Sequence, residues 1–222
     1  MGKKESYLDL VARRKSCLCC VGLTNPSTIE SGVYDSDHIG PWSRWQGGLD
    51  AEIMIVGQDW GDVDYFREWQ GIDQARGNAT NENLQKLLQE FGISVRKPRE
   101  PQPNVIFLTN LILCLKRGGL QAEIEEEWLQ NCSRNFFRDL VSIIQPKKVL
   151  ALGERVSKAI FNCYGIPFRK SWGLPKLMPK SPFRIGDGTL LFPLYHCGAR
   201  GVNLNRKIEW QRQDWRKAAD HK

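Results

Sequence analysis

The sequence predicts an α/β protein, a three-layer α/β/α sandwich around a central, mainly parallel, four-stranded sheet. Four short apolar runs end at polar or glycine residues, which is typical of strands buried on both faces. Helical patterns separate these runs, so the order is β-α-β-α-β-α-β. A length of 222 residues suits one sizeable core and is short for two ordinary domains. We therefore expect a single domain over residues 1–222.

The predicted elements follow one another along the chain. Strands are expected at Ile53–Val56, Val105–Leu108, Lys148–Leu152 and Thr189–Tyr195. Helices are expected from Leu84 to Phe91 before Gly92, from Ile124 to Ile144 before Pro146, from Val156 to Ile160 before Gly165, and from near Asn205 to the end (204–222). In sheets of this kind, ligands bind beyond the carboxyl ends of the strands. The loops that follow the strands are therefore the candidate functional sites.

Positive charge is in excess and is concentrated in the last third of the chain. The 32 Lys and Arg residues outnumber the 25 Asp and Glu residues, which gives a net charge of +7 with neutral histidines. The segment from Ile166 to Gly186 holds five basic residues and no acidic one, and the tail from His196 to Lys222 holds seven basic and three acidic residues. Such an excess favours a polyanionic partner.

Composition excludes several other classes of protein. With 41% apolar and 26% charged residues, the chain is neither disordered nor a membrane protein. The first residues lack a secretory apolar region, so we expect a cytoplasmic protein, associated with the nucleoid if the source is bacterial, in which disulfides are uncommon. Gly57 and Gly61 do not complete a dinucleotide fingerprint, and no Walker motif occurs, so no nucleotide cofactor is expected. We expect a monomer.

Three of the loops after strands carry side chains suited to chemistry. Asp59, in the run Gly57–Asp62, could act as a base, stabilise a cation or bind a metal, but an Asp in such a turn is as often a helix N-cap. Asn110 can present both a carbonyl and an amide group to a base edge, or it can tie down its own loop. His196 opens a glycine-rich basic loop. Together these residues indicate more than any one of them alone.

The seven cysteines supply a separate signal. Cys17 and Cys20 form a C-x-x-C, Cys114 follows the second strand, and Cys132 lies in the long helical pattern. If the fold brings these four together, they could hold zinc or an iron–sulfur cluster. Unrelated buried thiols are the alternative, and Cys163 and Cys197 have no expected role in a metal site.

These motifs resemble those of the uracil-DNA glycosylase superfamily, and most closely its iron–sulfur branch, family 4. Ile55–Asp59 resembles the water-activating loop, in the G-Q-D form of the main uracil glycosylases. Leu108–Cys114 resembles the T-N-x-x-x-C segment, and Cys132 with the later segment Ile144–Gly153 resembles the helix and strand that follow it. His196 resembles the His of the H-P-S motif. The resemblance runs from Cys17 to about residue 206, with the motifs in the family's order.

The sequence also departs from the family pattern. Cys197-Gly198 replaces Pro-Ser after the histidine, Trp60 stands where proline is usual, and Leu115–Arg117 replaces R-P-P after the cluster cysteine. The G-R-P-F segment, whose Phe stacks on the base, has no clean counterpart, which leaves Tyr65, Phe66 or Trp69 for that role. The candidates for the residue that intercalates into DNA are Ala199, Arg200 and Val202.

The resemblance implies hydrolysis of the N-glycosidic bond of a uracil, or of another damaged or modified base, that is flipped out of DNA. It implies that Asp59 orients water and stabilises the sugar cation, and that His196 donates a hydrogen bond to the developing oxyanion. It further implies that Asn110 reads the base edge with help from the backbone near Gln58, and that Phe66 stacks on the base. The activity belongs to base excision repair or to the processing of modified DNA.

The resemblance also implies a DNA partner and a structural metal centre. The basic stretches Arg169–Arg184 and Arg200–Lys217 suit phosphate contacts, with the candidates Arg169, Lys170, Lys176 and Arg200. The centre would be a 4Fe-4S cluster that ties the N-terminal segment (1–20) to the sheet, with zinc or no metal as alternatives; its candidate ligands are Cys17, Cys20, Cys114 and Cys132.

Three alternatives remain open at this point. The protein could be a glycosylase for a modified base other than uracil, or a member of the fold that binds nucleic acid without catalysis. It could also be a phosphoesterase with Asp59, Asp62 and Asp64 as Mg²⁺ ligands, although three carboxylates on one short loop make a poor two-metal site.

Overall fold

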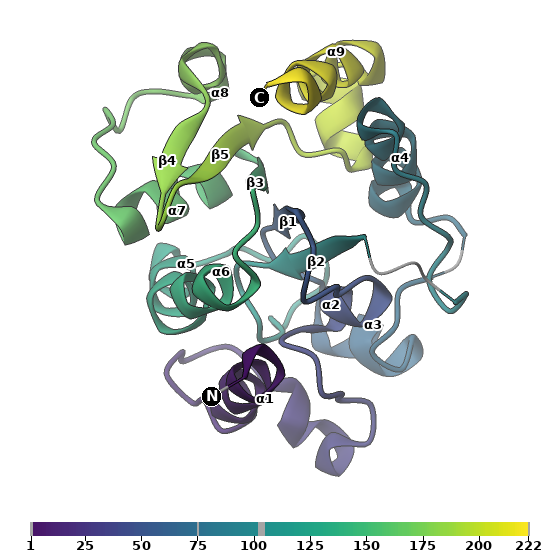
Figure 1. Cartoon of the computed structure of the whole chain (residues 1–222). Helices are drawn as coiled ribbons and strands as arrows, with labels where there is room; N and C mark the ends of the chain where they lie inside the picture. The colour runs from purple at the N-terminus through teal and green to yellow at the C-terminus, as the bar shows by residue number, and fades with distance from the viewer. Residues whose placement is uncertain (1, 75, 102–104, 222) are drawn as a thin grey trace.

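The computed structural model describes residues 2–74, 76–101 and 105–221, and it places a five-stranded sheet between two layers of helices (Figure 1). The strands are β1 (Ile53–Gly57), β2 (Ile106–Asn110), β3 (Lys148–Leu152), β4 (Phe183–Ile185) and β5 (Thr189–Leu194). Their order in the sheet is β2-β1-β3-β5-β4. All neighbouring pairs are parallel except β4 and β5, which are antiparallel.

The α/β prediction is confirmed, but the number of strands was too low. The additional strand, β4, lies in the basic segment from Ile166 to Gly186, where the sequence analysis expects no strand. It has only three residues, follows Pro182, and pairs with β5 at the edge of the sheet. A strand this short carries too few apolar positions for periodicity to reveal it.

The helices pack on both faces of the sheet. In chain order they are α1 (Lys3–Lys15), α2 (Pro41–Trp45), α3 (Val63–Glu68), α4 (Ala79–Leu88), α5 (Glu126–Cys132), α6 (Arg138–Ile144), α7 (Glu154–Tyr164), α8 (Leu174–Leu177) and α9 (Ile208–Asp220). Shorter helical turns are η1 (Pro26–Gly32), η2 (Gln89–Phe91), η3 (Ser133–Phe137), η4 (Met178–Lys180) and η5 (Gly201–Asn205).

Alternation along the strands divides the core into two halves, because successive side chains of a strand point to opposite faces. Met54 and Val56 of β1 belong to the half formed with α1, α5, α6 and α7. Ile55, between them, belongs to the half formed with α2, α4 and α9. Figure 1 shows α4 and α9 on one side of the sheet and α1, α5 and α6 on the other. The predicted three layers are therefore present.

Several helix boundaries differ from the predictions; α4, for example, begins at Ala79 rather than at Leu84. The pattern from Ile124 to Ile144 gives α5 and α6, joined by the π-helical turn η3 with helical backbone at the junctions. The C-terminal helix begins at Ile208 rather than near Asn205, because η5 precedes it and Arg206 has an extended backbone. No helix in the described part of the chain is long and apolar enough to cross a membrane.

Candidate active site

A cleft of about 580 Å³ opens at the carboxyl ends of the parallel strands. Asp59 follows β1, Asn110 ends β2, Gly153 follows β3, and His196 follows β5, and all four line the cleft. The parallel register puts the ends of β1 and β2 side by side, with Gly57 opposite Asn110. The topology therefore brings together the three residues that the sequence singled out in separate loops.

Asp59 is held from both oxygens in a nearly closed environment. Its Oδ2 lies 2.7 Å from Lys116 Nζ, and the two side chains are only 11% and 6% exposed. Its Oδ1 accepts a hydrogen bond of 3.0 Å from Gln58 Nε2. A carboxylate held in this way has a fixed direction and a compensated charge, which suits a group that must orient water rather than bind a helix end.

His196 has a tautomer that its own loop selects. The backbone N–H of Gly198 donates to Nδ1 at 3.0 Å, so Nδ1 is the acceptor and the proton of the neutral ring is on Nε2. Burial lowers the pKa of His196 below its usual 6.5, and the negative charge of Asp59 opposes this shift only in part. The ring is therefore a neutral donor at neutral pH, and it lines the cleft.

Asn110 is fixed by the close approach of β1. Its side chain lines the cleft, although the residue is only 8% exposed. The side chain passes over Gly57, where a Cβ would collide with Asn110 Oδ1 and would approach Trp42 Cζ3 to 3.0 Å. Glycine at this position therefore leaves the room that the amide occupies.

Phe66, predicted to stack on a flipped base, does not line the cleft. It is 1% exposed and packs with Ile29 and Leu115. Trp60 lies over it edge-on, with ring centroids 5.8 Å apart. The aromatic side chains that line the cleft are Trp42 and Trp60. The pattern of α3 turns Phe66 inward, and sequence reasoning overlooked Trp60 because it occupies a proline position of the family motif.

The cleft also contains a group of polar residues that the sequence analysis did not identify. Asp73, Asn78, Thr80 and Asn81 reach the cleft from the segment before α4 and its first turn. Asp73 accepts from Asn81 Nδ2 at 2.9 Å and from Tyr65 Oη at 3.3 Å. Burial raises its pKa to about 6, and these hydrogen bonds oppose the shift. The sequence signal for this group is the set of polar residues Asn78, Thr80 and Asn81 at the start of an amphipathic helix, directly after Gly77.

The basic candidates divide into two groups. Arg200 is exposed and lines the cleft. Arg169, Lys170 and Lys176 are exposed on the segment after α7 and do not line it. Lys158 Nζ joins that segment to the cleft wall: it donates to the carbonyl of Lys170 at 2.9 Å and to Glu154, a lining residue, at 2.6 Å. The first group lies at the site and the second lies beside it.

The three carboxylates considered as Mg²⁺ ligands do not converge. Asp62 is the N-cap of α3, where its Oδ1 accepts from Tyr65 N at 2.8 Å. Asp64 is 90% exposed and pairs with Arg67, while Asp59 pairs with Lys116. The geometry does not support a metal-dependent phosphoesterase at this loop.

The four cysteines of the predicted metal centre lie close to one another. A hydrogen bond between Cys20 and Cys132 lowers the pKa of Cys20 to about 6, and, with burial, raises that of Cys132 well above its usual value. Burial, reinforced by negative charge on Cys17 and Cys20, raises the pKa of Cys114 to about 12. Cys19 contacts Cys17 as well. The described residues contain no group already arranged as a metal site, but the donors suit a soft metal or a cluster.

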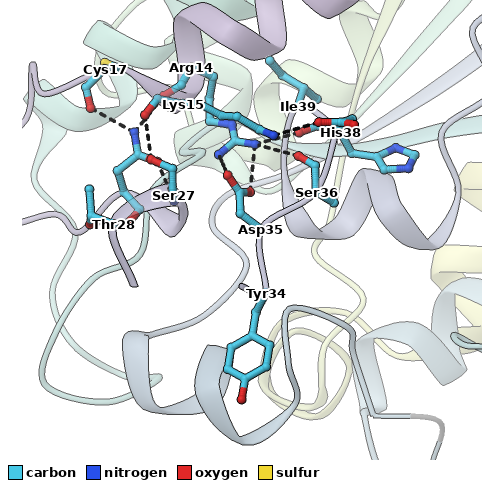
Figure 2. A network of polar contacts seen from close by, with 12 residues as sticks. Arg14, Lys15, Cys17, Ser27, Thr28, Tyr34, Asp35, Ser36, His38 and Ile39 are labelled. Atoms are coloured by element: carbon cyan, nitrogen blue, oxygen red, sulfur yellow. Dashed lines mark hydrogen bonds and ion pairs between the residues drawn. The ribbon is translucent and has the colours of Figure 1, made fainter. Parts of the chain in front are cut away.

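A buried polar network fixes the segment that carries Cys17 (Figure 2). Arg14 is 1% exposed, forms two hydrogen bonds with Asp35, and donates to the carbonyl of His38 at 2.9 Å. Asn25 Nδ2 donates to the carbonyls of Arg14 and Cys17 at 2.7 and 3.0 Å. The end of α1 is thus locked to the following loop, which presets the position of the first cysteine.

The remaining two cysteines have local partners. Cys163 Sγ donates to the carbonyl of Ser133 at 3.3 Å, and the buried Cys197 Sγ donates to the carbonyl of Thr80 at 3.5 Å. Cys197 therefore joins the His196 loop to the start of α4, and neither residue takes part in the cysteine group.

Comparison with known proteins agrees with this site. The profile of the family described as "Uracil DNA glycosylase superfamily" matches residues 45–219. The chain is 24% identical over 217 residues to the type-5 uracil-DNA glycosylase of Pyrobaculum aerophilum, an alignment that covers 90% of this chain and 86% of the relative. The predicted superfamily is confirmed, while placement in the family 4 branch stays a prediction. Since the profile covers most of the chain, the protein belongs to the uracil DNA glycosylase superfamily and is a DNA glycosylase.

Proposed function

We propose that the protein hydrolyses the N-glycosidic bond of uracil flipped out of DNA. The observation that carries this proposal is the neutral His196 ring, with Nε2–H as its donor, in one cleft with Asp59 and Asn110. The similarity to a type-5 uracil-DNA glycosylase supports uracil as the base. We propose that the protein acts in base excision repair through this reaction.

The chemistry needs negative charge near the sugar. As the base leaves, the sugar gains oxocarbenium character, and an anionic carboxylate nearby stabilises it. Asp59 is such a group, and its direction is set before substrate arrives by Lys116 and Gln58. It also orients the water that attacks C1′ and accepts the proton that this water loses.

The leaving base needs a hydrogen-bond donor that is not itself a strong acid. Uracil leaves as an anion, and a neutral imidazole N–H stabilises the developing oxyanion without transferring a full proton. His196 provides this donor, with Nδ1 occupied by Gly198 N–H. Asn110 offers both an acceptor and a donor to the base edge.

Positively charged side chains around the cleft are suited to contact the DNA phosphates. Unstacking a base costs a few kcal/mol, and contacts to the phosphates help to offset this cost. Arg200 stands at the cleft, and Arg169, Lys170 and Lys176 extend the basic surface beside it. Trp60 and Trp42 replace Phe66 as candidates for stacking on the flipped base.

A modified base other than uracil is the second candidate. Asp73, Asn78 and Asn81 add donors and acceptors that uracil recognition by Asn110 does not require. A base with more polar edges than uracil would use them. Release of such a base in preference to uracil would select this alternative.

We also propose that the gathered cysteines hold an iron–sulfur cluster, with zinc as the alternative. Cys17, Cys20, Cys114 and Cys132 would be the ligands, and the cluster would be structural. Asn131 Nδ2 donates to Cys20 Sγ at 3.6 Å, a hydrogen bond of the kind that tunes cluster sulfurs. Iron, sulfide and zinc analysis of anaerobically purified protein, with its visible absorption spectrum, tests this proposal.

The activity is tested by base release from duplex oligonucleotides that carry uracil or one of several modified bases. We expect free uracil and an abasic strand from the uracil duplex. Wild-type protein that releases no base from any substrate would overturn the proposed activity. Undiminished release by the double variant Asp59→Ala, His196→Ala would overturn the assigned roles.

A further inference from the structure

A second cavity, of about 590 Å³, is lined by residues to which base release assigns no role. Its walls come from α8, η4 and α9, all of which contact β5 (Figure 1). The strand β5 ends at Leu194, and the next two residues line different spaces: Tyr195 lines this cavity, and His196 lines the active-site cleft. We call this space the Tyr195 cavity. It borders the active site at two consecutive residues of the chain.

The Tyr195 cavity offers apolar and aromatic walls to an occupant. Its volume lies within the range of about 300–1,000 Å³ that is typical of small-molecule pockets. The half-buried ring of Tyr195 lines it. Apolar side chains add to the walls, among them Pro175, Met178, Pro179 and Phe192. Because aromatic rings stack well on other flat rings, these walls suit a planar occupant.

Two cations line the same cavity. The Arg206 guanidinium lies over the Tyr195 ring, with Cζ 5.7 Å from the ring centroid. Two hydrogen bonds to the buried Asp214 fix its plane, and a guanidinium carries more N–H donors than these two bonds use. Lys217 lines the cavity from α9 and is exposed. An aromatic platform with cations beside it is how proteins hold unpaired nucleotides, with the base stacked and the phosphate on the cation.

Trp210 extends this surface outward from the cavity. Arg206 Cζ lies over its ring as well, 5.6 Å from the centroid. The side chain is 51% exposed, which is unusual for so large an apolar group. The guanidinium therefore lies over two rings, one lining the cavity and one open to solvent. This arrangement gives a strand more than one place to stack.

A buried amide ties the cavity to the active site. Gln211 is 1% exposed, and its Nε2 donates to the carbonyl of Arg206 at 2.9 Å and to that of His196 at 3.4 Å. The backbone N–H of Arg206 donates to the carbonyl of Gly201 at 3.0 Å. The segments that line the two cavities are thus fixed relative to each other before DNA binds, which lowers the entropy cost of binding.

We propose that the Tyr195 cavity binds an unpaired base next to the flipped nucleotide on the same DNA strand, and that the protein therefore prefers single-stranded DNA to duplex. This inference rests on the proposed function, because the flipped nucleotide in the cleft brings its neighbour to Tyr195. In a duplex the neighbouring base must also leave its pair and stack, and this cost is least in a single strand. Tyr195 stacks on the base, while Arg206 and Lys217 contact its phosphates.

The first test measures binding to DNA without uracil, so that it does not depend on base release. The probe is a labelled single strand with a central tetrahydrofuran abasic analogue, and binding is followed by fluorescence anisotropy. We expect the wild type to bind this strand more tightly than the matching duplex. Tyr195→Ala should bind the single strand about 5- to 150-fold more weakly, as expected for the loss of one stacked base. Tyr195→Phe keeps the ring and should bind like the wild type.

A second variant lies away from the catalytic loop. Lys217→Ala should lower the slope of log affinity against log salt by about 0.7, the value for one phosphate contact to a single strand. Lys4→Ala, at an exposed lysine of α1 on the other side of the sheet, is the matched control and should leave the slope unchanged.

Cross-linking identifies the base in the cavity. The same single strand carries 5-iodocytosine on either side of the tetrahydrofuran, and after irradiation peptide mass mapping should place the adduct on Tyr195. An adduct outside the cavity, tighter binding of the duplex by the wild type, or equal affinity of Tyr195→Ala and Tyr195→Phe for the single strand would overturn the proposal.

Uracil release is measured separately from this binding. Binding that depends on Tyr195 without any base release would refute the proposed function alone. Base release with binding that does not depend on Tyr195 would refute this inference alone.

Discussion

Replacement of His196 by alanine tests the central feature of the site, a neutral donor fixed by its own loop. The change removes one N–H that faces the cleft and leaves the backbone carbonyl of the residue, to which Gln211 donates, in place. Because Gly198 N–H occupies Nδ1 in the wild type, the lost group is specifically the Nε2 donor. The residues that hold Asp59 are not altered.

The expected loss follows from the number of donors removed. Removing one donor to a developing oxyanion typically costs about 10²- to 10³-fold in kcat, or about 2.7–4 kcal/mol. Because His196 is largely buried, its loss should have the effect seen for preorganised donors, and not the smaller effect of a solvent-exposed donor. We therefore expect single-turnover release of uracil to slow by about 10²-fold or more, with little change in DNA binding. His221→Ala, at an exposed C-terminal histidine, is the matched control.

The pH dependence distinguishes a neutral donor from an acid. The pKa of His196 lies below 6.5, so the ring is mostly neutral at pH 7.5, and the rate should not fall as the pH rises from about 7 to 9. It should fall on the acid side, because a proton on Nδ1 would face the N–H of Gly198. A wild-type rate that declines with rising pH through this range, or a loss of less than about threefold in His196→Ala, would refute the reasoning.

Three further predictions concern the surroundings of the site. Gly57→Ala should displace Asn110 and lower base release. It should also lower the free energy of unfolding, measured with denaturant, by about 1–3 kcal/mol. Full activity of this variant would contradict the close approach of Gly57 and Asn110. Burial raises the folded pKa of Asp73 to about 6 from 3.8, so its ionisation costs nothing below about pH 4 and about 3 kcal/mol above about pH 6. The stability of Asp73→Asn relative to wild type should therefore rise between pH 4 and pH 7, and melting curves with no such trend would oppose this. Cys132→Ser should lose bound metal whereas Cys163→Ser keeps it, and equal metal content in both variants would contradict the ligand assignment.

Much of the site could be predicted because it depends on strand ends. The four apolar runs became β1, β2, β3 and β5, and parallel pairing places the residues after them at one edge. Asp59, Asn110 and His196 follow those runs in the sequence, so their convergence required no knowledge of side-chain packing.

What could not be predicted depends on packing between segments. Phe66 faces the core because of how α3 packs against η1 and Leu115, which a short helical pattern does not reveal. Lys116 lies 57 positions after Asp59 in the sequence, and only the folded loops bring the two together. Asp73 and its amide partners act through tertiary hydrogen bonds that leave no periodic signal.

The helix α1 sets a lower limit on any shortened form of this protein. Tyr7, Leu10 and Val11 are buried in the same half of the core as Phe107, and the rings of Tyr7 and Phe107 meet edge-on with centroids 6.0 Å apart. A fragment trimmed to the start of the family match at Trp45 would open that side of β2 to water and would lose Cys17 and Cys20. The stretch that the family profile matches is thus smaller than the packed core, which includes α1.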